Sequence, residues 1–321
     1  MSRIKTGVIG VGNMGYNHVR VYNELFSDVE LVGFYDIDKG KAQAVADRFN
    51  TRSFDTYENL LNHIQAVSIT TPTSLHLDHG LKAARAGVHT LIEKPIAASY
   101  AEGSELNNEF SKRGLLLQIG HIERYNPAVV ELKKIIETEE VLAINFRRLS
   151  SDRRIHDTDI VHDLMIHDID LMNWLVASPI SSIYTAGLTN VLGKDSIDYA
   201  EGLLKFENGI IACLTASRIT EDKIRTIDVH TSNSYIQVDC VSRSIQISRK
   251  TNYRLDVGHD ITYRQENILE KVIVPQYEPL KAQLSDFIRC VQTGDESPVS
   301  GTSGLEAVKV ADEISRLVLG D

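Results

Sequence analysis

An acid, a lysine and a proline follow directly on a short apolar run from Val88 to Ile92. The run is typical of a buried parallel strand, and Pro95 ends it. Lys94 should therefore stand at the carboxyl edge of a sheet, where open α/β folds bind their ligands. Partial burial beside Glu93 would suit the lysine to polarise or deprotonate a hydroxyl group. The alternative is an ordinary solvated lysine at a strand end.

A second polar stretch, from Arg153 to Asp170, contains candidate catalytic groups. Asp163 and His167 are four residues apart, which places them on one face of a helix expected over residues 163–176. A carboxylate there can hold one imidazole nitrogen and leave the other free as a base. Alcohol oxidation needs such a base, because the hydroxyl proton must leave while hydride passes to a nicotinamide. The alternative is a capped helix start with a surface ion pair.

We favour the catalytic interpretation because a nucleotide site is predicted at the start of the chain. The strand expected over residues 4–9 is followed by Gly10-Val11-Gly12-Asn13-Met14-Gly15 and then by an amphipathic segment. Gly10 would allow the tight turn, Gly12 would let a pyrophosphate approach the backbone, and Gly15 would let helix and strand pack closely. The free N–H groups of the helix start favour the same anion. Met14 is better explained by packing than by a specific ligand contact.

Asp36 points to the type of dinucleotide. It ends the next expected strand, residues 31–35, and follows Gly15 by 21 positions. A carboxylate there can accept hydrogen bonds from the adenosine ribose and would repel a 2′-phosphate, which favours NAD over NADP. The alternative is that Asp36 only begins a turn.

Two further readings of the polar stretch concern metals and anions. His156, His162 and His167 with their aspartates could in principle bind zinc, but no two of these histidines are four apart, so we expect no metal site. Four arginines precede or open the stretch, and guanidinium groups suit diphosphates because they bond in bidentate fashion. Ordinary surface arginines on an acidic chain are an equal alternative. The four are Arg147, Arg148, Arg153 and Arg154.

The elements that must position these residues fall into two parts. Strands alternate with helices up to residue 119, which predicts a doubly wound parallel sheet, a Rossmann domain, over residues 1–121. Residues 122–321 are expected to form an α+β domain with a large, mostly antiparallel sheet between residues 180 and 274. Asn208-Gly209 is the clearest hairpin signal there. Asn126-Pro127 reads as a helix cap followed by proline at the first helical position.

Helix starts are also marked by three capping boxes, each a short polar residue with a glutamate three positions later. They are Asp55 with Glu58, Ser99 with Glu102, and Ser303 with Glu306.

Composition excludes several classes of protein. A net charge of −10 argues against a general nucleic-acid binder. Three widely separated cysteines support neither a disulfide framework nor a zinc knuckle. The apolar runs are too short for a signal peptide or a membrane span. We therefore expect a cytoplasmic protein that acts on a small molecule and contacts neither nucleic acid nor membrane.

Together these motifs resemble the glucose–fructose oxidoreductase / inositol dehydrogenase / MocA family of NAD(P)-dependent oxidoreductases over the whole chain. The resemblance implies a catalytic set of Lys94, Asp163 and His167 and a homodimer or homotetramer formed through the sheet of the second domain. It also implies cofactor contacts from the glycine loop and from residues that follow later strands. These are Gly10, Gly12, Asn13, Met14, Gly15, Asp36, Thr71, Pro72, Thr73, His76, Glu93 and Lys94.

Residues 120–129 and 163–170 more narrowly resemble the UDP-N-acetylglucosamine 3-dehydrogenases of that family, which oxidise the sugar 3-hydroxyl with NAD. Tyr125 departs from the phenylalanine commoner there, and packing explains it better than a specific ligand contact. The substrate contacts so implied are Lys94, Arg124, Tyr125, Asn126, Arg154, Asp163 and His167. A dehydrogenase of a free polyol such as an inositol is the alternative, and a non-catalytic NAD-sensing regulator ranks lower because lysine and histidine are both present.

Overall fold

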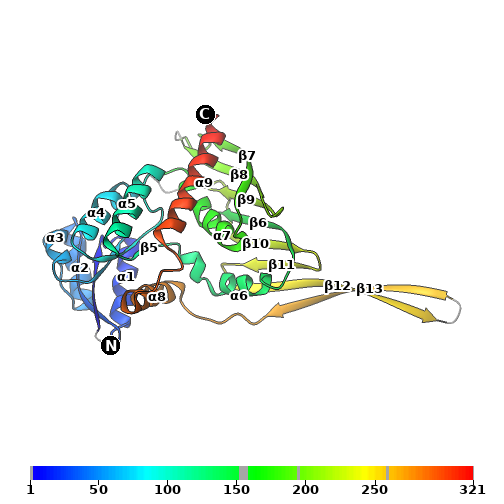
Figure 1. The fold of residues 1–321 in the computed structure, drawn as a ribbon, viewed down its shortest axis with the longest axis horizontal. Coiled ribbons are helices and arrows are strands. Elements are labelled where there is room, and N and C mark those ends of the chain that lie inside the picture. Colours follow the sequence, from blue (N-terminus) through cyan, green and yellow to red (C-terminus); the bar gives the residue numbers. More distant parts are fainter. Residues whose placement is uncertain (1–2, 152–157, 194–195, 258–259, 321) are drawn as a thin grey trace. The chain divides into compact units, whose positions relative to one another are not determined.

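The computed structural model describes residues 3–151, 158–193, 196–257 and 260–320. Contacts divide the chain into two compact units. The first consists of Met1–Tyr125 and Tyr277–Asp312, and the second of Asn126–Gln276 and Glu313–Asp321. The chain thus returns to the first unit after it has built most of the second. Figure 1 shows the elements of both units in sequence colours.

The first unit is a five-stranded parallel sheet with strand order β2-β1-β3-β4-β5. The order reverses between β1 and β3, the type of position at which such sheets bind ligands beyond their carboxyl ends. The strands are β1 (Ile4–Ile9), β2 (Val29–Tyr35), β3 (Ala66–Ile69), β4 (His89–Ile92) and β5 (Leu117–Ile119). The helices are α1 (Asn13–Glu24), α2 (Lys39–Phe49), α3 (Tyr57–Leu61), α4 (His76–Arg85), α5 (Tyr100–Arg113) and α8 (Pro279–Thr293), with 3₁₀ turns at Thr73–Leu75 and Ile122–Tyr125.

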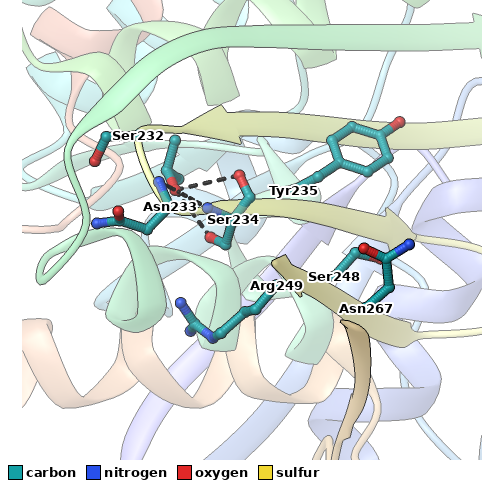
Figure 2. A pocket seen from close by; sticks show the side chains of 8 residues that line it. Ser232, Asn233, Ser234, Tyr235, Ser248, Arg249 and Asn267 are labelled. Carbon is teal, nitrogen blue, oxygen red and sulfur yellow. Dashed lines mark hydrogen bonds between the residues drawn. The ribbon is translucent and has the colours of Figure 1, made fainter. Parts of the chain in front are cut away.

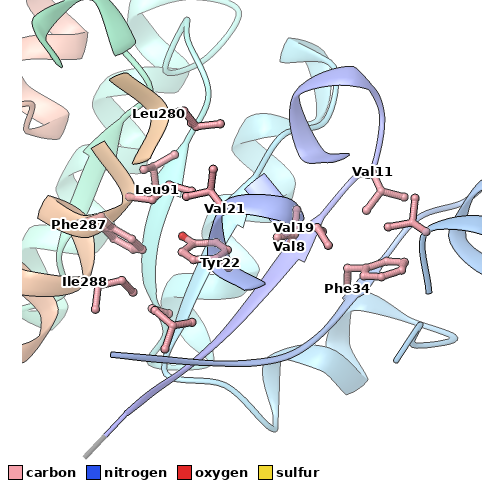
Figure 3. Close-up of a cluster of buried hydrophobic side chains, with 14 of the residues drawn as sticks. Val8, Val11, Val19, Val21, Tyr22, Phe34, Leu91, Leu280, Phe287 and Ile288 are labelled. Atoms are coloured by element: carbon pink, nitrogen blue, oxygen red, sulfur yellow. The ribbon is translucent and has the colours of Figure 1, made fainter. Parts of the chain in front are cut away.

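The core of this unit includes side chains from α8, a helix that comes late in the sequence. Leu284, Phe287 and Ile288 belong to the same buried cluster as Val21 and Tyr22 of α1 (Figure 3). Burying one such side chain contributes about 1.5–3 kcal/mol. The helix is therefore a part of the core of the first unit.

The second unit is built on an eight-stranded sheet with the order β13-β12-β11-β10-β6-β9-β8-β7. β6 and β9 run parallel, and the other neighbouring pairs of described strands are antiparallel. The strands are β6 (Val141–Leu149), β7 (Ile180–Thr189), β8 (Ile197–Phe206), β9 (Ile211–Ser217), β10 (Ile224–Thr231), β11 (Ser234–Asp239), β12 (Ser244–Val257) and β13 (Asp260–Val272). The predicted fold class, a Rossmann sheet followed by an α+β part, is confirmed.

The helical part of the second unit differs from expectation at the polar stretch. The helix expected to begin at Asp163 begins with a π-helical turn, Val161–Met165, and continues as α7 (Ile166–Val176). The other helices are α6 (Pro127–Ile136) and α9 (Gly301–Leu319), and the division between the two units falls within α9. The Asn208-Gly209 hairpin is confirmed between β8 and β9, with Gly209 at φ +88°.

The predicted N-cap is confirmed at one of the three capping boxes, where the side chain of Glu102 accepts from the N–H of Ala98 instead of Ser99. The Ser99 hydroxyl accepts a hydrogen bond from the N–H of Glu102 at the start of α5. The other two helices begin elsewhere. The Thr56 hydroxyl caps α3, and the hydroxyl of Ser300, the residue before α9, accepts from the N–H of Ser303. In both regions several short polar residues lie close together, and packing decides which one caps.

Candidate active site

The glycine loop forms a cradle at the carboxyl end of β1. Gly10 has φ +85°, a left-handed conformation that glycine adopts without strain. A Cβ on Gly15 would lie 1.8 Å from the carbonyl oxygen of Gly10, so only glycine permits this contact of helix and turn. A Cβ on Gly12 would meet no described atom within 4 Å. The backbone is therefore open at Gly12, the N-cap of α1, where free N–H groups favour an anion.

Asp36 supports this loop from the end of β2. Its Oδ2 accepts a 2.6 Å hydrogen bond from the N–H of Val11, and its Oδ1 accepts one of 2.8 Å from Asp38. Each carboxylate oxygen has a further lone pair for a ligand hydroxyl. The residues present thus fit a dinucleotide: an open glycine turn, a helix start and a half-buried carboxylate beside them.

The turn after β3 is tied to the same loop. The Thr70 hydroxyl donates to the carbonyl of Gly10 (2.6 Å), and the Thr71 methyl lies close to Gly10, where a Cβ would approach it to 3.0 Å. Thr71 and Thr73 are half-buried, and Pro72 is exposed. Asn13 and Met14 open α1, with Asn13 exposed and Met14 half-buried. All of the residues predicted from the loop and this turn are therefore near the same edge of the first sheet.

Glu93 and Lys94 follow β4, which pairs with β3 at Ile69 and Ile92. Glu93 Oε1 lies 3.1 Å from Nε2 of His18, a fully buried histidine of α1. Gly120 leaves the space that the Glu93 carboxylate occupies, because a Cβ there would lie 2.8 Å from it. Lys94 is half-buried, and its backbone leads on to the buried Pro95 and Ile96. The predicted position of Lys94, at the carboxyl edge of the sheet, is confirmed. The sequence analysis did not identify His18.

The polar stretch of the second unit is arranged around an arginine that the sequence analysis missed. Arg218, at the end of β9, is 5% exposed, and its Nη2 donates to Asp163 Oδ2 at 3.1 Å. The same nitrogen donates to the carbonyl of Thr158 at 2.9 Å. His167 is half-buried on the first turn of α7. An arginine at the end of an otherwise apolar strand was the signal that could have identified Arg218.

Arg147 and Arg148, two of the four arginines proposed to act together, do not share a surface. Arg147 is exposed, while Arg148 is 2% exposed and donates from Nε and Nη2 to Asp168 Oδ1 at 3.0 and 2.7 Å. Successive residues of a strand point to opposite faces, so Arg147 and Arg148 of β6 cannot form one diphosphate cluster. Arg148 is instead half of a buried ion pair. Arg153 and Arg154, like His156, lie outside the described residues.

The three residues before α6 have partners of their own. The Tyr125 hydroxyl donates to Asp286 Oδ2 at 2.7 Å, and Arg124 donates to the carbonyl of Pro298 at 2.8 Å. Burial and the charge of Asp286 raise the pKa of Tyr125. Asn126 caps α6, as predicted, by accepting from the N–H of Ala128. Substrate contacts from Arg124, Tyr125 and Asn126 stay a prediction.

A separate hollow lies in the second unit at the turn between β10 and β11 (Figure 2). Hydroxyl and amide groups of the turn line it, together with Arg249. This arginine is paired with Glu139 at 2.9 Å and with Glu270 at 3.2 Å, so its charge is balanced. None of the predicted site residues lines this hollow.

In the described part of the chain, no three histidine, cysteine or acidic side chains gather closely enough to hold a metal ion. Among the helices described, none is both long and apolar enough to cross a membrane. The cysteines Cys213, Cys240 and Cys290 are free thiols.

Comparison with known proteins agrees with the fold and with the glycine loop. Residues 4–121 match the NAD-binding Rossmann fold of an oxidoreductase family, and residues 145–237 match the GFO/IDH/MocA C-terminal domain. The UDP-N-acetylglucosamine 3-dehydrogenase of Acidithiobacillus ferrooxidans is 29% identical over 98% of this chain and 97% of its own. A solved structure of that enzyme has a TM-score of 0.87, with 30% identity, and covers 99% of this chain and 98% of its own.

A second group of relatives acts, by name, on inositols. The scyllo-inositol 2-dehydrogenase (NAD⁺) of Bacillus subtilis is 29% identical over 67% of this chain and 68% of its own.

Levoglucosan dehydrogenase, solved in complex with NADH, shares the fold at a TM-score of 0.83 and 19% identity, covering 99% of this chain and 98% of its own. From the two family matches and the full-length similarity at 30% identity, the chain belongs to the GFO/IDH/MocA family of oxidoreductases with an NAD-binding Rossmann fold.

Proposed function

We propose that this protein is an NAD-dependent dehydrogenase that oxidises a secondary alcohol of a sugar to a ketone, with the 3-hydroxyl of UDP-N-acetylglucosamine as the substrate group. The observation that carries the proposal is the similarity to a UDP-N-acetylglucosamine 3-dehydrogenase over both units and almost the full length of both chains. The inositol dehydrogenase relative covers about two thirds of the chain.

The proposed roles follow from the chemistry of each side chain. His167 takes the proton of the reacting hydroxyl, and Lys94 orients and polarises the same oxygen. Asp163 holds the imidazole of His167, and the Arg218 guanidinium, 3.1 Å away, anchors that carboxylate. Bound NAD would supply the hydride acceptor. The proposal requires Lys94 and His167 to reach one substrate molecule.

The cofactor would be held by the loop and carboxylate already described. The open backbone at Gly12 and the start of α1 would receive the pyrophosphate, and Asp36 would accept from the adenosine ribose. The turn Thr71–Thr73 and the segment Glu93–Lys94 would line the rest of the cofactor site. We propose Arg124, Tyr125, Asn126 and Arg154 as substrate contacts on the basis of the resemblance alone.

A free polyol such as an inositol is the second candidate substrate. It is favoured by the inositol dehydrogenase relatives and by the burial of Arg148, which removes one of the four arginines considered for a diphosphate. The two candidates differ in whether UDP competes with the substrate.

The test is NADH formation from NAD, followed by absorbance, with UDP-N-acetylglucosamine, scyllo-inositol and myo-inositol as separate substrates. Glutamate and an aminotransferase for the 3-keto sugar would pull the equilibrium forward. We expect turnover of the UDP-sugar and competitive inhibition by UDP. Turnover of an inositol without inhibition by UDP would support the second candidate. Binding of NAD without turnover of any sugar would support a non-catalytic regulator.

We also propose that the outer face of the second sheet joins copies of the chain. Tyr184 is 66% exposed and Leu203, its cross-strand neighbour, is 45% exposed, whereas Leu204 on the opposite face is buried. An uncovered apolar row of this kind is typical of an interface. Sedimentation of the wild type compared with Leu203→Glu tests this interface, and an unchanged mass would contradict it.

Location in the cytoplasm stays a prediction.

A further inference from the structure

His76 has an unusual pair of partners. It is the first residue of α4 and is 1% exposed. Its Nδ1 lies 2.8 Å from the carbonyl oxygen of Pro95, and its Nε2 lies 2.9 Å from the carbonyl oxygen of Thr71. Both partners are acceptors that have no proton to give. The ring therefore faces two hydrogen-bond acceptors at once in a site closed to water.

A neutral imidazole can satisfy only one of these two carbonyls. It carries one N–H, and its other nitrogen would direct a lone pair at an oxygen. The imidazolium ion carries two N–H groups and satisfies both. Hydrogen bonds from a charged donor are also the stronger kind. The number of bonds that His76 makes therefore depends on its protonation.

The two carbonyls belong to the two loops that matter for the proposed reaction. Thr71 follows β3 and packs against Gly10 of the glycine loop. Pro95 is the residue after Lys94. His76 thus joins the main chain of the turn after β3 to the main chain beside the proposed catalytic lysine. Neither bond uses a flexible side chain on the partner, so a shift of the ring moves backbone.

We propose that His76 is a positioning residue, which fixes Lys94 against the turn after β3 through the carbonyls of Pro95 and Thr71. It holds Lys94 most tightly as the imidazolium ion. This inference rests on the proposed function, in which Lys94 polarises the reacting hydroxyl. It adds a residue that contacts neither reacting atom and acts only through Lys94.

The groups around His76 act on its pKa in opposite directions. Burial lowers the pKa of His76 below 6.5, while the carbonyls of Pro95 and Thr71 act in the opposite direction. The charge of Glu93 favours the imidazolium ion, and the charge of Lys94 disfavours it. On its own helix it faces His79, whose pKa burial also lowers. As the pH rises through the pKa of His76, one of the two bonds is lost.

Two amide variants separate the two bonds. In His76→Asn the side-chain amide nitrogen takes the place of Nδ1 and can still donate to Pro95. In His76→Gln it takes the place of Nε2 and can still donate to Thr71. We expect His76→Asn to keep kcat within about threefold of wild type and His76→Gln to lose about tenfold, the equivalent of 1.4 kcal/mol. Both ring nitrogens of His76 are bonded to main-chain carbonyls, so neither is left for the cofactor contact that the resemblance implies. The dissociation constant of NADH should therefore change less than threefold in both variants.

His89→Asn is the matched control. His89 is the first residue of β4, the strand that Lys94 follows, and its Nδ1 accepts from the N–H of Leu116 at 3.0 Å. The His89→Asn variant should lower the melting temperature without the loss of kcat. If His76→Asn lost as much activity as His76→Gln, or if the loss of kcat followed the melting temperature across all three variants, the positioning role would be overturned.

Two readouts do not need a substrate, so they separate this inference from the proposed function. The first is the acetylation rate of Lys94, measured by peptide mass spectrometry, which should change in His76→Gln and remain near wild type in His76→Asn. Equal rates in all variants would overturn the inference. The second is nitrogen NMR of ¹⁵N-histidine protein between about pH 5 and 8, with His76→Asn assigning the signal. Protons on both ring nitrogens at the acid end support it, and a ring with one proton throughout contradicts it.

Discussion

The carboxylate of Asp36 accepts a 2.6 Å hydrogen bond from the main-chain N–H of Val11, inside the glycine loop. The same group is the one expected to choose between NAD and NADP. A single carboxylate thus shapes the loop and, in the proposed cofactor site, would repel a 2′-phosphate. These two tasks can be separated by substitution.

Asp36→Asn should keep an acceptor for Val11 while it removes the charge. We expect the affinity for NADH to fall about tenfold, because a charge-assisted bond contributes about 1.5–3 kcal/mol. The preference for NADH over NADPH should also fall at least about tenfold, measured by fluorescence titration of both. Asp38→Asn, which changes a nearby helix-capping carboxylate of α2, is the control. An unchanged preference in Asp36→Asn would contradict the assignment.

Gly12 and Gly15 of the glycine loop should respond differently to alanine. Gly15→Ala forces a Cβ against the Gly10 carbonyl and should cost about 1–3 kcal/mol or more in the free energy of unfolding. Gly12→Ala meets open space and should leave that free energy within about 0.5 kcal/mol, but weaken NAD binding roughly tenfold or more. Gly40→Ala in α2 should affect neither. Denaturant unfolding and NADH titration decide, and tight NADH binding by Gly12→Ala would refute the open cradle.

Lys94→Ala tests the proposed chemistry directly. Loss of a group that polarises or deprotonates the hydroxyl should lower kcat by about 10²–10⁴ while the dissociation constant of NADH changes little. Lys112→Ala, an exposed lysine at the end of α5, is the control and should turn over normally. The measurement is the initial rate of NADH formation alongside a fluorescence titration. Near-normal turnover by Lys94→Ala would remove it from the catalytic set.

The buried pair of Arg148 and Asp168 predicts an asymmetry in stability. Arg148→Met alone leaves the Asp168 charge buried and should cost about 3–5 kcal/mol. The double variant Arg148→Met with Asp168→Leu should recover much of that loss, since a packed apolar pair can replace a buried ion pair. Urea unfolding of both variants provides the comparison. A double variant less stable than the single one would show that the pair itself stabilises the fold.

Asp159 predicts a dependence of stability on pH. Burial alone would raise its pKa, but hydrogen bonds from the His162 ring and main chain and from Ser315 hold the pKa below the ordinary 3.8. A pKa lowered by folding stabilises the protein above the unfolded value, and this contribution is lost as the pH falls through the folded value. Asp159→Asn should therefore be less stable than wild type at neutral pH, and the difference should be smaller at a second, acid pH below 3.8.

The matched control for that experiment is Asp55→Asn, whose side chain is almost fully exposed. It should show no such change in stability between the two pH values. A constant difference between wild type and Asp159→Asn at both pH values would contradict the assigned cause.

Local patterns predicted several elements well because the signals for these elements are local. The strand from Ile4 to Ile9, the turn at Gly10 and the Asn126 cap depend on neighbouring residues, and the structure has them as expected. The family assignment and the fold class also followed from these patterns. The roles of Lys94, Asp163 and His167 stay predictions.

The features that the sequence analysis missed depend on distant residues. The partner of Asp163 is Arg218, which is 55 positions away, and the partner of Glu93 is His18, which is 75 away. The parallel pairing of β6 with β9 and the opposite faces of Arg147 and Arg148 arise only when the sheet is assembled. The π-helical turn at Val161–Met165 inserts into a segment whose spacing still fits an ordinary helix.

The late position of α8 has a consequence for synthesis on the ribosome. Phe287 and its neighbours complete a core whose other side chains were made more than 150 residues earlier, and all of β6–β13 are translated in between. The nascent nucleotide-binding unit therefore keeps an apolar surface uncovered until α8, Pro279–Thr293, has been translated. A ribosome stalled before residue 277 would hold a nascent chain with this apolar surface exposed. A chaperone would be needed to cover the surface, even if the glycine loop had already formed.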